Sequence, residues 1–221
     1  MKARVEKFAA ELGSDIVLPC DVANDDDITG LFELLGNHWD SLDALVHSIA
    51  FAPREALAGD YLENLDREGF RMAHDISSYS LAAMAKAGRA MMQNTNGAII
   101  TMTYLGSERA LPNYNIMGVA KAALESSVRY LARDFGPQDI RVNAISAGPI
   151  RTLAAAGIYG FRDMYGRFLA TAPLKQHITT EDVGGSAVFL SSDLASKSTG
   201  EVLFVDGGFN IIGMPESPEK E

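Results

Sequence analysis

Apolar residues follow two alternating patterns along the chain. Short, mainly apolar runs predict buried strands, and stretches in which apolar residues recur every three or four positions predict helices. The expected strands cover residues 15–22, 43–51, 97–105, 140–148 and 201–208. The expected helices cover residues 1–13, 24–39, 64–92, 112–135 and 179–193, while residues 149–173 are less regular. Pro112 suits the first turn of the fourth of these helices.

The alternation predicts an α/β fold, a Rossmann-like doubly wound parallel sheet with helices on both faces. We expect one such domain over residues 1–212 and a flexible tail over residues 213–221. Ligands of these sheets bind outside the carboxyl ends of the strands. The residues expected at those ends are Asp21, Ser48 to Ala52, Tyr104 and Ala147 to Ile150. A single ligand site at one edge of the sheet is therefore predicted.

Composition excludes several function classes. The 221 residues carry 19 basic and 29 acidic side chains, a formal net charge of −10, which argues against a protein that binds nucleic acid through phosphates. No run approaches the roughly 18–20 apolar residues of a membrane span. Cys20 is the one cysteine, and no cysteine or histidine spacing suggests a metal site. We expect a protein of a reducing compartment, the cytoplasm, without metal, membrane or nucleic-acid partners.

Tyr104, Tyr114 and Lys121 form the candidate chemical centre, in the stretch YLGSERALPNYNIMGVAK. Seven residues on a helix make nearly two turns, so Tyr114 and Lys121 are expected on one face. A nearby ammonium favours phenolate and is expected to lower the pKa of Tyr114. Tyr104 ends a predicted strand, from where its hydroxyl can reach the same pocket. The alternative is two core tyrosines and a solvated lysine, which a bare pair with this spacing would favour.

Further motifs turn this pattern into a family resemblance. The stretches LGSDIVLPCDV, VHSIAFAP, AHDISSYS, RVNAISAGPIRTLAA and GEVLFVDGGF accompany the two tyrosines and the lysine. Over most of its length the chain resembles the enoyl-acyl-carrier-protein reductases of bacterial type II fatty-acid synthesis. These enzymes are a divergent branch of the short-chain dehydrogenase/reductases, in which the lysine follows the tyrosine by seven positions and a second tyrosine replaces the usual serine.

The resemblance implies roles for individual residues. Tyr114 would hydrogen-bond the thioester carbonyl of an enoyl-acyl-carrier-protein substrate, with Tyr104 and Lys121 as the other catalytic residues. The cofactor would be NADH, and the implied assembly is a homotetramer. The implied cofactor-binding residues are Asp21, Val22, Ser48, Ile49, Lys121, Ile150, Thr152 and Ala154. The implied substrate-binding residues are Ala52, Tyr104, Tyr114, Phe161 and Met164, with Tyr159, Phe161 and Met164 in a mobile lid.

The resemblance also implies that the fold lacks its first two strands and its glycine-rich turn, about 40 residues. We expect the true protein to begin upstream of Met1. The alternatives are a truncation, or a rearranged sheet in which residues 15–22 pair directly with residues 43–51. Two functional alternatives also stay open. One is a ketoacyl reductase or other short-chain dehydrogenase, and the other is a catalytically impaired remnant. Preference for NADH or NADPH is left open.

Overall fold

The computed structural model describes residues 2–152 and 160–214. In these ranges the strands form one parallel sheet in the order β1-β2-β3-β4. The strands are β1 (Ala44–His47), β2 (Ala98–Thr103), β3 (Arg141–Ala147) and β4 (Val202–Val205). Leu45 lies opposite Ile99, and Ile145 lies opposite Leu203. The predicted parallel α/β sheet is confirmed, and each of these strands falls inside a range predicted from the sequence.

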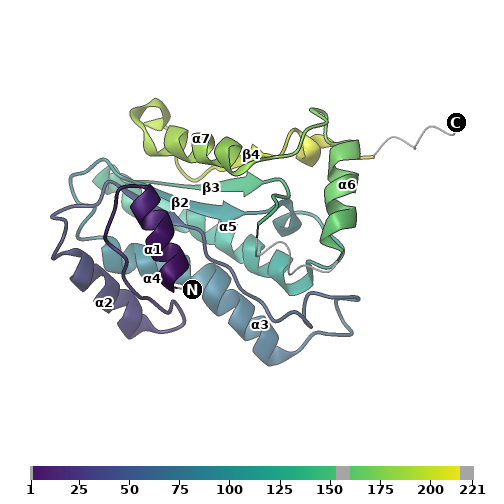
Figure 1. Cartoon of the computed structure of the whole chain (residues 1–221), viewed down its shortest axis with the longest axis horizontal. Helices are drawn as coiled ribbons and strands as arrows, with labels where there is room; N and C mark the ends of the chain where they lie inside the picture. The colour runs from purple at the N-terminus through teal and green to yellow at the C-terminus, as the bar shows by residue number, and fades with distance from the viewer. Residues whose placement is uncertain (1, 153–159, 215–221) are drawn as a thin grey trace, which may run out of the picture.

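Helices cover both faces of the sheet (Figure 1). They are α1 (Lys2–Glu11), α2 (Asp25–Leu35), α3 (Arg67–His74), α4 (Ser80–Gly88), α5 (Asn115–Phe135), α6 (Phe161–Thr171) and α7 (Thr180–Ser191). Short 3₁₀ turns cover Leu105–Ser107, Gly136–Gln138, Asp193–Ala195 and Phe209–Ile211, and a π-helix covers Asp75–Tyr79. No helix in the described ranges is both long and apolar enough to cross a membrane.

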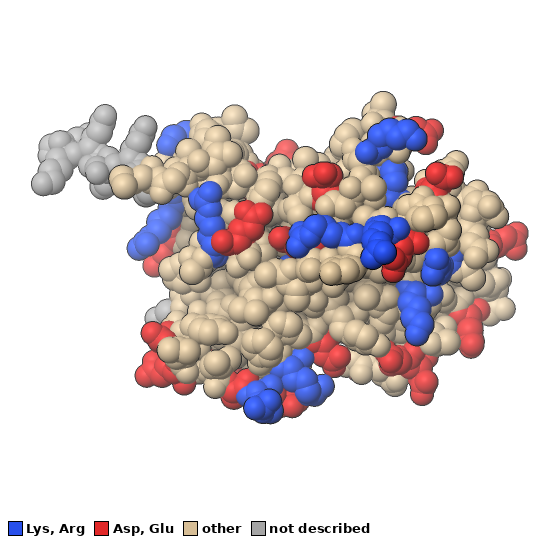
Figure 2. Space-filling view, turned by 180° about the vertical axis from the view of Figure 1, so that it is seen from behind, with Lys and Arg blue, Asp and Glu red and all other residues tan. Residues whose placement is uncertain are grey.

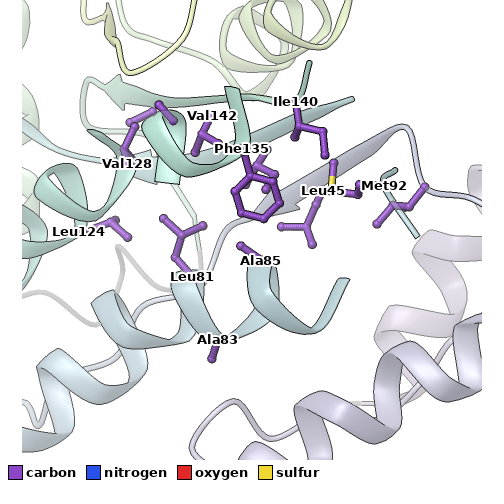
Figure 3. Close-up of a cluster of buried hydrophobic side chains, with 14 of the residues drawn as sticks. Leu45, Leu81, Ala83, Ala85, Met92, Leu124, Val128, Phe135, Ile140 and Val142 are labelled. Atoms are coloured by element: carbon purple, nitrogen blue, oxygen red, sulfur yellow. The ribbon is translucent and has the colours of Figure 1, made fainter. Parts of the chain in front are cut away.

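Side chains of the central strands alternate between two apolar layers, as the pleat of a strand requires. Ile99 and Val142 pack in the large core with Leu81 and Leu124, which come from α4 and α5. The next residue of β2, Ile100, points to the opposite layer, where it packs with Leu190 of α7. Figure 3 shows side chains of α4, α5 and the strands meeting in the large core. Strands buried on both faces explain the continuous apolar runs in the sequence.

The strand predicted over residues 15–22 is wrong. Residues 15–22 pair with no strand of the described chain, so the alternative of a rearranged pairing with residues 43–51 is wrong as well. The apolar pattern of this segment reflects burial of side chains and not strand pairing, because Val22 packs in the large core and Cys20 lies against it. Among the described strands β1 pairs with β2 alone. Its other edge pairs with no strand in residues 2–152 and 160–214, and Val46 of this strand is 54% exposed.

Two helix predictions also need correction. Pro112 lies in a turn, and α5 begins at Asn115. Asn113 in this turn and Asn115 at the first position of α5 have positive φ angles of 60° and 39°, which a continuous right-handed helix from Pro112 would not allow. Residues 149–173, predicted to be less regular, contain α6 (Phe161–Thr171). The expected long helix over residues 64–92 is confirmed as α3 and α4, joined by the π-helix Asp75–Tyr79.

A buried histidine joins β1 to its neighbours. His47 is 1% exposed, with Nδ1 at 2.9 Å from the Thr101 hydroxyl of β2 and Nε2 at 2.8 Å from the Ser80 hydroxyl of α4. The Ser80 hydroxyl donates to the Ile76 carbonyl, and the Thr101 hydroxyl donates to the His47 carbonyl at 3.2 Å, so both hydroxyls are fixed by the backbone beside the ring. Burial, with a smaller effect of the Lys121 charge, lowers the pKa of His47 to about 4. His47 is therefore neutral in the folded protein at pH 7.

This burial predicts a pH-dependent stability. An unfolded histidine binds a proton near pH 6.5, whereas folded His47 resists protonation down to about pH 4. The unfolded chain thus binds more protons between these values, and the contribution of His47 is complete above pH 6.5 and lost as pH falls toward 4. The linkage amounts to about 3 kcal/mol.

Denaturant unfolding at several pH values measures this contribution. His47→Gln should give a shallower fall of the unfolding free energy between pH 6.5 and 4 than the unmodified chain, because its side chain does not titrate. His38 is exposed in a loop, so His38→Gln should retain the original slope and serves as the control. Equal slopes for all three proteins would contradict the assignment.

Candidate active site

A cavity of about 460 Å³ opens at the carboxyl ends of β2 and β3. Its walls come from the segments that follow β1, β2 and β3, from the start of α5 and from α6. Among its lining residues are these predicted site residues: Ala52, Tyr104, Tyr114, Ile150, Thr152, Phe161 and Met164. Of the residues predicted to meet at one sheet edge, Ala50 to Ala52, Tyr104 and Ala147 to Ile150 line the cavity, so the predicted convergence is confirmed for them.

The two tyrosines meet in the wall of the cavity. Tyr104 follows the last residue of β2, and Tyr114 occupies the position before the first residue of α5. Their ring centroids are 5.0 Å apart at an interplanar angle of 76°, an edge-to-face contact that aromatic rings favour. The Tyr104 hydroxyl also donates a long hydrogen bond of 3.5 Å to the Met164 sulfur of α6. Tyr104 therefore links the end of β2 to both α5 and α6.

Burial keeps both phenols protonated. Loss of solvent, with a smaller effect of the Asp206 charge, raises the pKa of Tyr104 to about 12. Burial also raises the pKa of Tyr114 well above its usual value, and Tyr104 and Glu125 raise it further. The prediction that a nearby ammonium lowers the pKa of Tyr114 is wrong, because desolvation disfavours the phenolate and dominates here. At neutral pH Tyr114 is thus a hydrogen-bond donor.

Lys121 lies behind the cavity wall. Its side chain is buried, with 4% exposure, and Nζ donates a 2.7 Å hydrogen bond to the Met102 carbonyl of β2. Burial lowers the pKa of Lys121 to about 8, and the Glu125 charge acts in the opposite direction. The alternative of a solvated lysine is therefore wrong. Tyr114 lines the cavity, whereas Lys121 is absent from its described lining. The phenol of Tyr114 is therefore at the cavity surface, and the ammonium of Lys121 is directed to the β2 backbone.

Two hydrogen bonds join the segment after β1 to the π-helix. Buried Ser77 accepts from the Phe51 backbone N–H at 2.9 Å and donates to the Phe51 carbonyl at 3.0 Å. Phe51 and Ala52 thereby reach the cavity. Ser48 is exposed, and Ile49 is half-buried against the large core, so these two predicted cofactor residues lie outside the cavity lining.

The remaining cofactor predictions lie farther from the cavity or outside the described residues. Asp21 is exposed, and one oxygen of its carboxylate accepts from the Ala23 backbone N–H at 3.0 Å. Val22 packs its side chain in the large core. Ala154 and Tyr159 fall in residues 153–159, outside the described ranges.

The described residues suit one end of a dinucleotide better than its middle. The loop at residues 48–52, the residues Gly148 to Thr152 and the Lys121 ammonium surround the carboxyl ends of β1 to β3, where a nicotinamide and its ribose would fit. An exposed Asp21 carboxylate suits an adenine amino group. The sequence holds no G-x-G-x-x-G turn to receive a pyrophosphate.

Sequence reasoning missed several lining residues. Met117 follows Tyr114 by three positions, and helical spacing would have placed it in the same wall. Leu57 lines the cavity, and the Asn115 side chain donates to its carbonyl at 2.9 Å. This contact joins segments far apart in the sequence, so local sequence patterns do not predict it. Thr103 was also missed, although it immediately precedes Tyr104.

Comparison with known proteins agrees with this geometry. The family model described as "Enoyl-(Acyl carrier protein) reductase" matches residues 1–210. The chain is 59% identical to the enoyl-(acyl-carrier-protein) reductase (NADH) FabI of Salmonella typhimurium over 98% of this chain and 82% of the relative. It is 56% identical to the protein of the same name from Haemophilus influenzae, over 100% of this chain and 84% of the relative.

Solved structures give the same result. A crystal structure of the enoyl-(acyl-carrier-protein) reductase (NADH) from Aquifex aeolicus matches with a TM-score of 0.93 and 50% identity, over 96% of this chain and 82% of that one. A reductase from Anaplasma phagocytophilum in complex with NAD matches with a TM-score of 0.92 and 40% identity, over 100% of this chain and 81% of that one. This chain belongs to the enoyl-(acyl-carrier-protein) reductase family.

Proposed function

We propose that this chain reduces the trans-2 double bond of enoyl-acyl-carrier-protein thioesters with NADH, in the elongation cycle of fatty-acid synthesis. The observation that carries the proposal is the pair of buried, protonated tyrosines at an apolar cavity. Family membership and the names of the relatives support the same activity. We further propose that residues 1–212 act as one domain in the cytoplasm.

Tyr114 is proposed to stabilise the charge that develops on the substrate. Reduction at the β-carbon of an enoyl thioester moves electron density onto the thioester carbonyl oxygen. A phenol that stays protonated can donate a hydrogen bond to this oxygen, and the donor is stronger in an apolar site than in water. Tyr104 holds the Tyr114 ring by its edge-to-face contact and shapes the acyl site through Met164. Protonation of the α-carbon is assigned to Tyr114 or to a chain of water molecules.

Bound NADH supplies the hydride for this reaction. The residues proposed to hold it are Asp21, Val22, Ser48, Ile49, Lys121, Ile150, Thr152 and Ala154. Asp21 would accept from the adenine amino group, the Ile150 backbone would bond the carboxamide, and the Lys121 ammonium would donate to the nicotinamide ribose.

With a pKa of about 8, Lys121 keeps its proton at neutral pH and loses it under mildly alkaline conditions. Activity should therefore decline above about pH 8.

The acyl chain is proposed to lie against Ala52, Phe161 and Met164, which supply apolar cavity surface. The thioester would approach from the exposed side of α6. Arg162 and Arg167 of α6 are exposed, and Arg151 is exposed with its guanidinium 4.6 Å from the Tyr165 ring centroid. These three cations are proposed to contact the acidic carrier protein, for which this chain of net charge −10 needs a local basic surface.

A homotetramer is proposed because two helices expose apolar side chains. Val119 and Tyr130 of α5 are 40% and 67% exposed, and Val188 and Phe189 of α7 are 69% and 41% exposed. Figure 2 shows acidic and basic side chains interspersed on the face it presents, with a wide uncharged band between them. Apolar helix faces of this kind suit packing against further copies of the same chain.

A spectrophotometric assay of NADH oxidation tests the proposed activity. With NADH and a crotonyl thioester the chain should oxidise NADH, seen as a fall in absorbance, and it should leave a ketoacyl thioester unreduced. Reduction of the ketoacyl substrate alone would identify a ketoacyl reductase instead. An NADH titration followed by fluorescence tests the alternative of a catalytically impaired remnant. That alternative requires that the chain fail to bind NADH, so observed binding would exclude it.

Tyr114→Phe should lower kcat for the enoyl thioester by about 100-fold or more, the usual loss when one oxyanion donor is removed. The ring and its contact with Tyr104 remain, so KM for NADH should change little. Tyr61→Phe also removes a phenol hydroxyl, from an exposed position outside the cavity lining, and should retain full turnover. Equal turnover in the two variants would exclude Tyr114 from the chemistry.

The Tyr114 ring lies against a glycine that allows no side chain. A Cβ on Gly106 would stand 2.5 Å or less from two carbons of that ring, Cδ1 and Cε1, well inside contact distance. Gly106→Ala should therefore displace the ring and lower kcat by roughly 100-fold, the scale expected for a shift of about 1 Å.

Gly30→Ala is the matched control, measured in the same assay with melting temperature alongside. A Cβ on Gly30, within α2, would meet nothing within 4 Å. This change should keep activity and stabilise the fold by about 0.5–1 kcal/mol. A fully active Gly106→Ala variant would show that the ring position is unimportant for catalysis.

A further inference from the structure

A buried carboxylate lies behind the proposed active site and has no part in the chemistry described so far. Glu125 is on α5, one helical turn after Lys121, and is 6% exposed. Its Oε1 accepts a 2.6 Å hydrogen bond from the Thr103 hydroxyl. Thr103 is the last residue of β2, lines the cavity and precedes Tyr104.

Burial makes this carboxylate costly unless it has compensating partners. An ionised group removed from water requires hydrogen bonds and an opposite charge close by. Thr103 supplies the hydrogen bond, and Lys121, at the i−4 position on the same helix, supplies a cation that is itself 4% exposed. The Glu125 charge in turn opposes the loss of the proton from Lys121.

The geometry points to Glu125 as a positioning residue of the active site, which holds Thr103 in the cavity wall and keeps Lys121 protonated as its buried counter-charge. This inference rests on the proposed function, because it assigns Lys121 its role as an ammonium that binds the cofactor ribose. Glu125 contacts neither substrate nor cofactor and acts through its two neighbours.

The electrostatic surroundings agree with this role. Tyr114, which directly precedes α5, is affected by the Glu125 charge, and the carboxylate disfavours its phenolate. Tyr104, from the end of β2, has the same effect on Tyr114 and is itself affected by Asp206, just after β4. His47, at the end of β1, is neutral and adds no positive charge near Lys121. One carboxylate thus favours both the phenol of Tyr114 and the ammonium of Lys121.

The test measures the protonation of Lys121 directly, without substrate or cofactor. In protein labelled with carbon-13 at lysine Cε, the Lys121 signal is assigned by its loss in Lys121→Met and followed through a pH titration. Glu125→Gln keeps an acceptor for Thr103 but removes the charge, and should lower the pKa of Lys121 by about one unit. In the enoyl thioester assay, the alkaline decline of kcat/KM should move to lower pH by the same amount.

Two further variants separate charge from geometry. Thr103→Val removes the hydrogen bond and keeps the carboxylate, so the pKa of Lys121 should stay near its original value while KM for the enoyl substrate rises. Glu33→Gln removes an exposed carboxylate on α2 and should change neither measurement. If Glu125→Gln does not fold, the double change Thr103→Val with Glu125→Met replaces both partners by apolar groups and should show the same shift.

An unchanged Lys121 titration in a folded, charge-free variant overturns the inference and reduces Glu125 to a structural residue. That result is distinct from failure of the proposed function. Absence of enoyl reduction by the unmodified chain would reject the activity, whereas the titration would still report whether Glu125 holds the proton on Lys121.

Discussion

Two polar contacts between α5 and the end of β2 determine where the candidate chemistry lies. Lys121 donates to the Met102 carbonyl and Glu125 accepts from the Thr103 hydroxyl, at successive residues of the strand. Tyr104 is the next residue, so its position depends on both contacts. Because these groups are buried, each would be costly to leave without a partner, and the helix has little freedom to slide along the strand. Tyr114, at the start of the same helix, is thereby held against Tyr104.

Desolvation then sets the protonation states in a way that suits reduction of a thioester. The same burial raises the pKa of the tyrosines and lowers the pKa of Lys121, because in each case it disfavours the charged form. The tyrosines are therefore neutral hydrogen-bond donors over the physiological pH range. Lys121 is also protonated at neutral pH, but its pKa of about 8 lies close to that pH. A lysine near its titration point needs a counter-charge, and Glu125 supplies one that water does not screen.

The sequence allowed the sheet and the convergence of distant motifs to be predicted, because these depend on regular physical patterns. Parallel strands share one carboxyl edge, so Tyr104 and Ile150 had to lie near each other once their strands were recognised. Residues 15–22 carried the apolar pattern of a strand, but pairing depends on a neighbouring backbone that composition does not reveal. The pKa of Tyr114 was predicted in the wrong direction for a similar reason. Its burial depends on side chains such as Ala52 and Leu57, which come from the segment after β1, far from Tyr114 in the sequence.

The buried charges of Lys121 and Glu125 are set apart from the two phenols that line the cavity. The cavity surface is largely apolar, and the two phenols are among its polar groups, whereas Lys121 and Glu125 are buried and absent from its described lining. An apolar surface excludes water from the acyl chain and strengthens the hydrogen bond that Tyr114 donates. A carboxylate placed in the cavity itself would repel the negative charge that develops on the thioester oxygen. Placed one layer deeper, and joined to the wall through neutral Thr103, the carboxylate can stabilise Lys121 while a hydroxyl and two phenols face the reacting group.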